Sequence, residues 1–197
     1  AVYDQIKRVL DTLCAIPVGL ATLAFVPLLW LMNRILAPGP LFYHQERVGR
    51  HGRPFQLWKF RTMQVDAEKN GPQFSGGTAT DPRVTKIGRW LRQLRIDELP
   101  QIWNVLRGDL SFIGPRPERP EFVAPLLAQE PSYGLRHVTR PGLTGWAQVT
   151  YLKPNERNED NLVKLQYDLY YLKHRSIILD GLILLKTIRI VLRRQGT

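Results

Sequence analysis

The longest apolar stretch of the chain lies close to its N-terminus. From Thr12 to Asn33, 22 residues follow one another without a charge, and Leu, Ala and Val predominate. As one continuous helix this stretch would be about 33 Å long, close to the roughly 30 Å hydrocarbon thickness of a bilayer. We therefore predict a membrane helix here. A buried helix of a soluble protein and a secretory signal are the alternatives.

Basic residues flank the apolar stretch on both sides. Two precede it and four follow it within twenty residues: Lys7, Arg8, Arg34, Arg47, Arg50 and Arg53. Basic flanks favour the cytoplasmic side of a membrane, so we expect the chain to enter and leave on one face. Pro17 and Pro27 lie inside the stretch, where either can kink a helix. The pattern favours a re-entrant helix that dips into the bilayer and returns, although a simple span also fits the length.

After residue 40, shorter alternating and amphipathic segments replace the apolar run. We predict a β-hairpin from strands at Leu41–Arg47 and Pro54–Met63, joined by the loop Gly49–Arg53, and a short strand at Trp146–Val149. Helices are predicted at Val84–Leu94, Glu118–Gln129, Asn158–Lys173 and Ile177–Arg194. The last helix suits a membrane interface or packing on the protein's own core. The Gly-rich segment Asn70–Pro82 is expected to be a loop that closes over a ligand.

The predicted fold class is α+β and mostly helical, with an N-terminal re-entrant membrane helix, a small β-hairpin or sheet, and amphipathic interfacial helices. We expect residues 1–40 to form the membrane helix and its flanks, and residues 41–197 to form a domain on the cytoplasmic face that folds as one unit with it. Ala1 rather than Met opens the chain. We therefore expect a piece of a longer protein, with a further domain upstream.

The charge of the chain indicates anionic partners. The formal net charge is +11 and the pI is about 10.2, which leaves nucleic acid, anionic lipid and nucleotide substrates open. Cys14 is the only cysteine, so disulfide frameworks and cysteine metal sites are excluded. The four histidines show no metal-ligand spacing.

The candidate chemistry is concentrated between Arg92 and Pro117, in the stretch RQLRIDELPQIWNVLRGDLSFIGPRP. Pro100 is tolerated in a first helical turn, which predicts a helix with Asp97 near its N-cap, Glu98 just inside, and Gly108 at its end. The two carboxylates could simply cap the helix and complement its dipole. Four arginines lie close by in the stretch, and carboxylates, a helix N-terminus and arginines together suit a magnesium-bound phosphate ester.

Several long motifs, in order, resemble one family. They are Arg8-x-x-Asp11, Pro38-Gly39-Pro40, QERVGRHGRPFQLWKFRTM at 45–63, DPRVTKIGRWLR at 81–92, DELPQIWNVLRGDLSFIGPRP at 97–117, RPGLTGWAQV at 140–149 and QYDLYYLKH around Asp168. Over nearly its whole length the chain resembles the catalytic domain of the monotopic bacterial sugar transferases, the polyprenyl-phosphate phosphoglycosyl transferases. Members of the exopolysaccharide-initiating type are similar around residues 118–122. One departure is that Val26-Pro27 stands where the family commonly has a Ser-Pro break.

The resemblance implies transfer of a sugar phosphate from a UDP-sugar to undecaprenyl phosphate, with release of UMP, at the cytoplasmic face of the bacterial inner membrane. It implies Asp97 as the nucleophile that forms a covalent phosphosugar intermediate, Glu98 as its acidic partner, and Mg²⁺ held at these two carboxylates. Four further residues fall on substrate- or phosphate-binding positions: Lys59, Arg116, Arg140 and Asp168. The similarity around residues 118–122 favours glucose phosphate or galactose phosphate as the transferred group.

Simpler roles stand beside these assignments. Arg116 could brace a proline-rich turn, Lys59 could keep a strand edge soluble, and Asp168 could pair with a lysine on its own helix. For the whole chain, a non-catalytic basic adaptor that binds anionic phospholipid membranes is the alternative function. Nucleic acid is not expected as a partner, because no recognisable binding motif accompanies the charge. A homodimer is one open assembly state.

Overall fold

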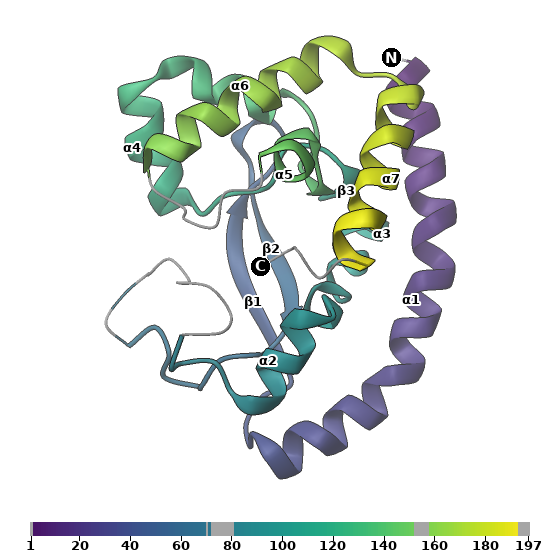
Figure 1. The fold of residues 1–197 in the computed structure, drawn as a ribbon, viewed down its shortest axis with the longest axis vertical. Helices are drawn as coiled ribbons and strands as arrows, with labels where there is room; N and C mark the ends of the chain where they lie inside the picture. The colour runs from purple at the N-terminus through teal and green to yellow at the C-terminus, as the bar shows by residue number, and fades with distance from the viewer. Residues whose placement is uncertain (1, 70, 72–80, 152–157, 193–197) are drawn as a thin grey trace.

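The computed structural model describes residues 2–69, 71, 81–151 and 158–192, and it is mostly helical, as the sequence predicts (Figure 1). The α-helices are α1 (Val2–Leu36), α2 (Lys86–Gln93), α3 (Gln101–Arg107), α4 (Pro120–Gln129), α5 (Trp146–Thr150), α6 (Asn158–His174) and α7 (Ile177–Leu192). The strands are β1 (Phe42–Val48), β2 (Pro54–Phe60), β3 (Ser111–Ile113) and β4 (Gly142–Thr144), and 3₁₀ turns are η1 (Arg50–Gly52), η2 (Ile96–Glu98) and η3 (Pro131–Val138).

The apolar N-terminal stretch forms one continuous helix. α1 is 35 residues long with a mean hydropathy of 2.1 over its most apolar window, of which 17% is buried, so it is long and apolar enough to cross a membrane. Pro17 and Pro27 both lie inside it, and α1 bends in its lower half in Figure 1. Its buried residues form one stripe at helical spacing: Asp11, Ala15, Thr22, Leu29 and Asn33. The re-entrant path remains a prediction.

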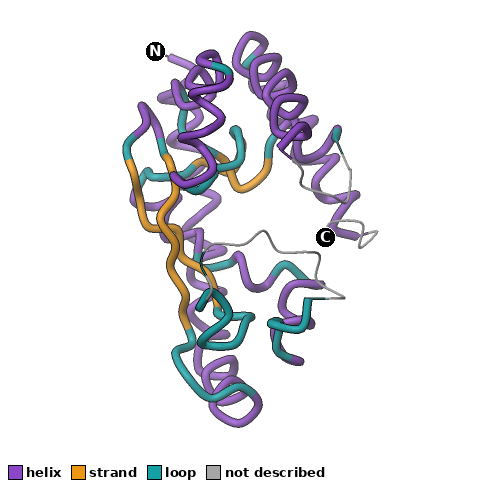
Figure 2. Tube along the Cα trace, turned by 90° about the vertical axis from the view of Figure 1, so that its left-hand side faces the viewer, coloured by secondary structure: helices purple, strands orange, loops and turns teal. Residues whose placement is uncertain are grey.

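The predicted hairpin is confirmed. β1 and β2 are antiparallel, from the pair Phe42–Phe60 to the pair Val48–Pro54, and the hairpin runs lengthwise through the molecule (Figures 1 and 2). The 3₁₀ turn η1 closes it, with His51 in a left-handed conformation at φ 57°. α6 and α4 lie at one end of the hairpin and α2 lies at the other (Figure 1).

Asn104 fixes α3 against β2. Its side chain is fully buried, accepts a hydrogen bond from the Trp58 backbone N–H at 3.1 Å, and donates one to the Gln56 carbonyl at 2.7 Å. Around it, Ile102 and Val105 of α3 pack in one cluster with Leu57 of β2 and Ala15 of α1. These contacts set the register of the segment before α3 relative to β2.

The predicted strand at Trp146–Val149 is wrong, because these residues form α5. The strand lies earlier, at Gly142–Thr144, and pairs in parallel with β3. A Cβ on Gly142 would lie 2.1 Å from the Gly114 nitrogen, and one on Gly145 would lie 2.2 Å from the Gly114 oxygen. Only glycine allows this close backbone approach. Pairing therefore occurs along the glycine-bracketed segment, and the chain turns into a helix at Trp146.

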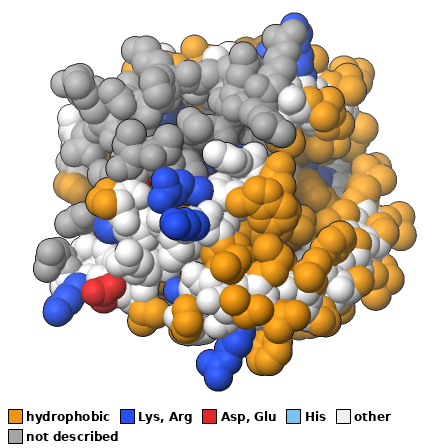
Figure 3. Space-filling view, turned by 60° about the horizontal axis from the view of Figure 1, so that its bottom comes forward, with side chains coloured by type: hydrophobic (Ala, Val, Ile, Leu, Met, Phe, Trp, Pro, Cys, Tyr) orange, Lys and Arg blue, Asp and Glu red, His pale blue; other side chains and the backbone are white. Residues whose placement is uncertain are grey.

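Exposed apolar side chains gather on α1 and α7. One face of α7 packs on β3 and α5 through Ile183, which is fully buried, whereas Ile178, Leu185 and Leu192 on its other face are 87%, 68% and 79% exposed. Figure 3 shows apolar side chains covering much of the lower end of the molecule, with Lys and Arg beside them. One face of the last helix packs on the core, as one of the two alternatives expects, and its place at a membrane interface remains a prediction. The predicted loop Asn70–Pro82 lies mostly outside the described residues.

Candidate active site

Asp97 and Glu98 lie in a 3₁₀ turn that precedes α3. The expected N-cap at Asp97 is wrong: α3 begins at Gln101 after its N-cap Pro100, whereas Gly108 ends it in a left-handed conformation, as predicted. The Glu98 N–H donates to the Arg95 carbonyl, three residues earlier, at 3.3 Å. This is the 3₁₀ pattern, whereas an α-helix bonds each N–H to the carbonyl four residues earlier. Arg95 itself has a left-handed backbone at φ 57°. This residue separates α2 from η2 and changes the direction of the chain before the two carboxylates.

Three cations surround the carboxylate of Glu98. Its Oε1 atom lies 3.1 Å from Lys59 Nζ, 3.4 Å from an Arg116 terminal nitrogen and 3.9 Å from an Arg95 terminal nitrogen. Burial by itself would raise the pKa of Glu98, but the positive charges of Lys59, Arg116 and Arg95 outweigh it and hold the pKa well below its ordinary value. Glu98 is therefore an ionised anchor for the cations around it.

Asp97 has the opposite environment. Its side chain is buried, and its Oδ1 atom has no hydrogen-bond partner among the residues that the structure describes. Burial raises the pKa of Asp97 above its ordinary value, although the charge of Lys59 opposes this shift. A buried carboxylate oxygen without a partner is poorly solvated, and it suits a bond to a cation or an attack on an electrophile.

β2 and the Gly114–Pro117 loop bring the predicted cations to the carboxylates. Lys59 pairs with Tyr43 across the hairpin and reaches η2 from β2. Burial lowers the pKa of Lys59, while the charge of Glu98 opposes the shift. Arg116 reaches Glu98 from the loop that follows β3. Four of the six predicted site residues thus meet, from segments nearly sixty residues apart in sequence.

The other two predicted residues make different contacts. Arg140 donates a hydrogen bond from Nε to the Gly108 carbonyl at 3.1 Å, at the end of α3 opposite Asp97. Asp168 is buried on α6 and pairs with Arg136 at 2.8 Å. Arg136 in turn donates to the Arg116 carbonyl at 2.9 Å, so Asp168 reaches the site only indirectly by this route.

Sequence reasoning assigned no site role to Arg95 or Arg136. Arg95 lies in the arginine-rich stretch around the two carboxylates, and this closeness in sequence could have indicated its contact with Glu98. Arg136 lies four residues before the Arg140–Val149 motif, and nothing in its spacing indicates a contact with the Gly114–Pro117 loop.

The carboxylates partly fit the expected Mg²⁺. Among the described residues no group of three or more His, Cys, Asp or Glu side chains could hold a metal ion. Mg²⁺ is commonly bound by one or two carboxylates together with substrate phosphates. The unpartnered Oδ1 of Asp97 and the second oxygen of Glu98 suit such a shared site.

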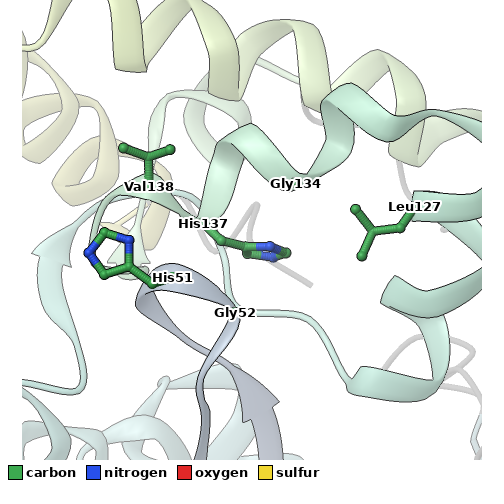
Figure 4. Close-up of a pocket in the computed structure, with 6 residues that line it drawn as sticks. All are labelled: His51, Gly52, Leu127, Gly134, His137 and Val138. Carbon is green, nitrogen blue, oxygen red and sulfur yellow. The ribbon is translucent and has the colours of Figure 1, made fainter.

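A separate pocket opens between η1, α4 and η3. Its volume is about 280 Å³, and it is lined by His51, Gly52, Leu127, Gly134, His137 and Val138 (Figure 4). None of the predicted site residues lines it.

The comparisons with known proteins agree on one family. The sequence profile of the bacterial sugar transferases matches residues 2–194. A UDP-N-acetylgalactosamine-undecaprenyl-phosphate N-acetylgalactosaminephosphotransferase of Aeromonas hydrophila is 43% identical over 198 residues, covering 99% of this chain and 45% of the relative. A UDP-glucose:undecaprenyl-phosphate glucose-1-phosphate transferase of Caulobacter vibrioides is 40% identical, covering 94% of this chain and 69% of the relative. An Escherichia coli protein of that same name is 35% identical, covering 93% and 39%.

The chain therefore spans less than half the length of the Aeromonas and Escherichia relatives. Its match to the family profile nonetheless extends over nearly all of its own residues. This chain belongs to the bacterial sugar transferase family.

Proposed function

We propose that this chain transfers a sugar phosphate from a UDP-sugar to undecaprenyl phosphate and releases UMP. The observation that carries the proposal is the contrast between two adjacent carboxylates. Glu98 is neutralised by cations from β2, from Arg95 just before η2 and from the Gly114–Pro117 loop, whereas Asp97 keeps a buried oxygen with no partner among the described residues. The names of the relatives support this substrate pair.

Asp97 is the proposed nucleophile. Its carboxylate oxygen attacks the phosphorus that carries the sugar, the bond from this phosphorus to the UMP oxygen breaks, and UMP leaves with the electron pair. An oxygen of undecaprenyl phosphate then attacks the same phosphorus and releases Asp97 as a carboxylate. The sugar phosphate has then moved without any change in oxidation state, and the product is a lipid-linked diphosphate sugar.

The cations and Glu98 prepare the site for a charged donor. Lys59, Arg116 and Arg95 supply positive charge beside the diphosphate, where phosphoryl transfer accumulates negative charge. Glu98 holds these side chains in place and keeps their net charge moderate. Mg²⁺, when bound at Asp97 and Glu98 with the substrate phosphates, would offset further charge on the phosphate oxygens.

The apolar surface supports a membrane location for this reaction. α1 and the exposed face of α7 would place the site near the headgroups, where the phosphate of a polyprenyl lipid lies (Figure 3). We propose the cytoplasmic face of the bacterial inner membrane and a re-entrant α1. Single cysteines placed at Asp4 and at Arg50, in a Cys14→Ser background, should react with an impermeant reagent from the same side. Reaction from opposite sides would contradict the re-entrant path.

UMP release tests the proposed function. The purified chain in lipid nanodiscs should turn over UDP-N-acetylgalactosamine or UDP-glucose, with repeated release of UMP, only with Mg²⁺ and undecaprenyl phosphate both present; without acceptor it should release at most one UMP per protein. Asp97→Asn should abolish turnover, whereas Asp66→Asn, at an exposed loop aspartate, should not. Without acceptor, the wild-type protein should gain the mass of one sugar phosphate on Asp97.

Two outcomes would count against the proposal. Activity in Asp97→Asn would remove the nucleophile assignment. Binding to anionic vesicles with no UMP release from any UDP-sugar would favour the adaptor alternative instead.

A further inference from the structure

The Gly114–Pro117 loop is held in an unusual way. Pro115 and Pro117 have no N–H to donate, so the loop has little capacity to fix itself by its own donors. Instead, four consecutive carbonyls accept hydrogen bonds from other segments: Pro115 from the Gly142 N–H at 2.9 Å, Arg116 from Arg136 at 2.9 Å, Pro117 from Arg47 at 3.0 Å, and Glu118 from the Val48 N–H at 2.9 Å. Side chains therefore fix the two central carbonyls.

Arg136 is the better buried of these two arginines. It is 5% exposed, and it lies between Asp168, which is 2% exposed, and Tyr133, which is 1% exposed. One terminal nitrogen of Arg136 is shared by the Asp168 carboxylate at 2.8 Å and the Arg116 carbonyl at 2.9 Å. The other terminal nitrogen donates to the Tyr133 hydroxyl. Asp168 neutralises the buried charge, and without this partner the arginine would be costly to keep there.

We propose that Arg136 is a positioning residue for the transfer reaction. It connects the buried Asp168 of α6 to the main chain at Arg116, and it thereby sets where the Arg116 side chain meets Glu98. The Arg116 side chain is 36% exposed and lies 3.4 Å from Glu98, so its distance to Glu98 depends on where its main chain lies. This inference rests on the proposed function, and it gives Asp168 an indirect role through Arg136 in place of a contact with substrate.

The test replaces the forked guanidinium but keeps its charge. Arg136→Lys retains a cation beside Asp168 but cannot serve the carboxylate, the carbonyl and the hydroxyl together. Arg175→Lys is the matched control, because Arg175 also pairs with an aspartate, Asp4, at 3.2 Å, away from the loop. We expect kcat for UMP release to fall about 10-fold or more in Arg136→Lys, as for a misplaced catalytic group, and to stay near wild type in Arg175→Lys.

A double-mutant cycle separates positioning from general support of the fold. If Arg136 acts through Arg116, Arg136→Lys should cost little further activity in an Arg116→Ala background. Wild-type kcat in Arg136→Lys, or losses that simply multiply in the double variant, would overturn the inference.

Hydrogen exchange gives a readout that needs no activity. The Gly142 and Val48 amides bond to the carbonyls on either side of the segment that the two arginines hold. In Arg136→Lys we expect both amides to exchange about 10-fold faster, the factor that loss of one charged hydrogen bond implies. Unchanged exchange at both would overturn the inference, even if the wild-type protein released no UMP and the proposed function had therefore failed.

Discussion

His137 predicts a pH-dependent loss of stability that can be measured without any substrate. Its imidazole lines the pocket in Figure 4 and lies edge-on to the Tyr133 ring, with ring centroids 6.2 Å apart. Burial, together with the charge of the neighbouring Arg136, lowers the pKa of His137 to about 4 from an ordinary value of 6.5. The folded protein therefore keeps this ring neutral at pH values where the unfolded chain protonates it.

The sign and size of the effect follow from this difference. Between pH 6.5 and pH 4 the unfolded chain binds one more proton here than the folded chain, so the free energy of unfolding decreases as the pH falls. The full shift corresponds to about 3 kcal/mol. Because the ring is only partly buried and solvent screens it, we expect about 2 kcal/mol in practice.

Denaturant unfolding of wild type and His137→Gln at pH 7 and at pH 4.5 measures this contribution. Other groups also titrate over this range, so the comparison is between the losses of the two proteins. Wild type should lose about 1 to 2 kcal/mol more than His137→Gln. Equal losses in wild type and His137→Gln would refute the reasoning.

Three further predictions concern the active site and the packing around it. Lys59→Met should lower kcat/KM for UMP release about 100-fold, because Glu98 loses its nearest cation. Lys59→Arg keeps the charge and should lose less activity, and equal losses in the two variants would contradict a charge effect. EDTA should abolish UMP release, and added Mg²⁺ should restore it, with little change in melting temperature, because the described carboxylates form no group of three. Gly142→Ala should destabilise the fold by about 3 kcal/mol in thermal melts, since its Cβ would meet the Gly114 backbone. Gly181→Ala, which meets nothing within 4 Å, should be neutral or stabilising.

Local sequence signals predicted most of the secondary structure. The apolar run, the alternating strands around Gly49–Arg53 and the stop at Gly108 each depend on neighbouring residues, and each agrees with the structure. Of the two errors, the N-cap error is local, because short-range bonds form η2 before α3, whereas the strand error lies where distant backbone contacts override local preference. Trp146–Val149 has the composition of a strand, but pairing with β3 requires the glycines before it, where Gly114 approaches.

By itself, the sequence determined most of the helices, the hairpin, the long apolar stretch, and the concentration of carboxylates and arginines between Arg92 and Pro117. Only the tertiary structure decided which of these carboxylates is paired with which cations. It gives Glu98 the cations of β2 and the proline-rich loop, leaves one oxygen of buried Asp97 without a described partner, and ties Asp168 to the loop through Arg136. The reason is physical, because pKa values and the roles of charged groups depend on burial and on neighbours in space, which spacing along a chain does not specify.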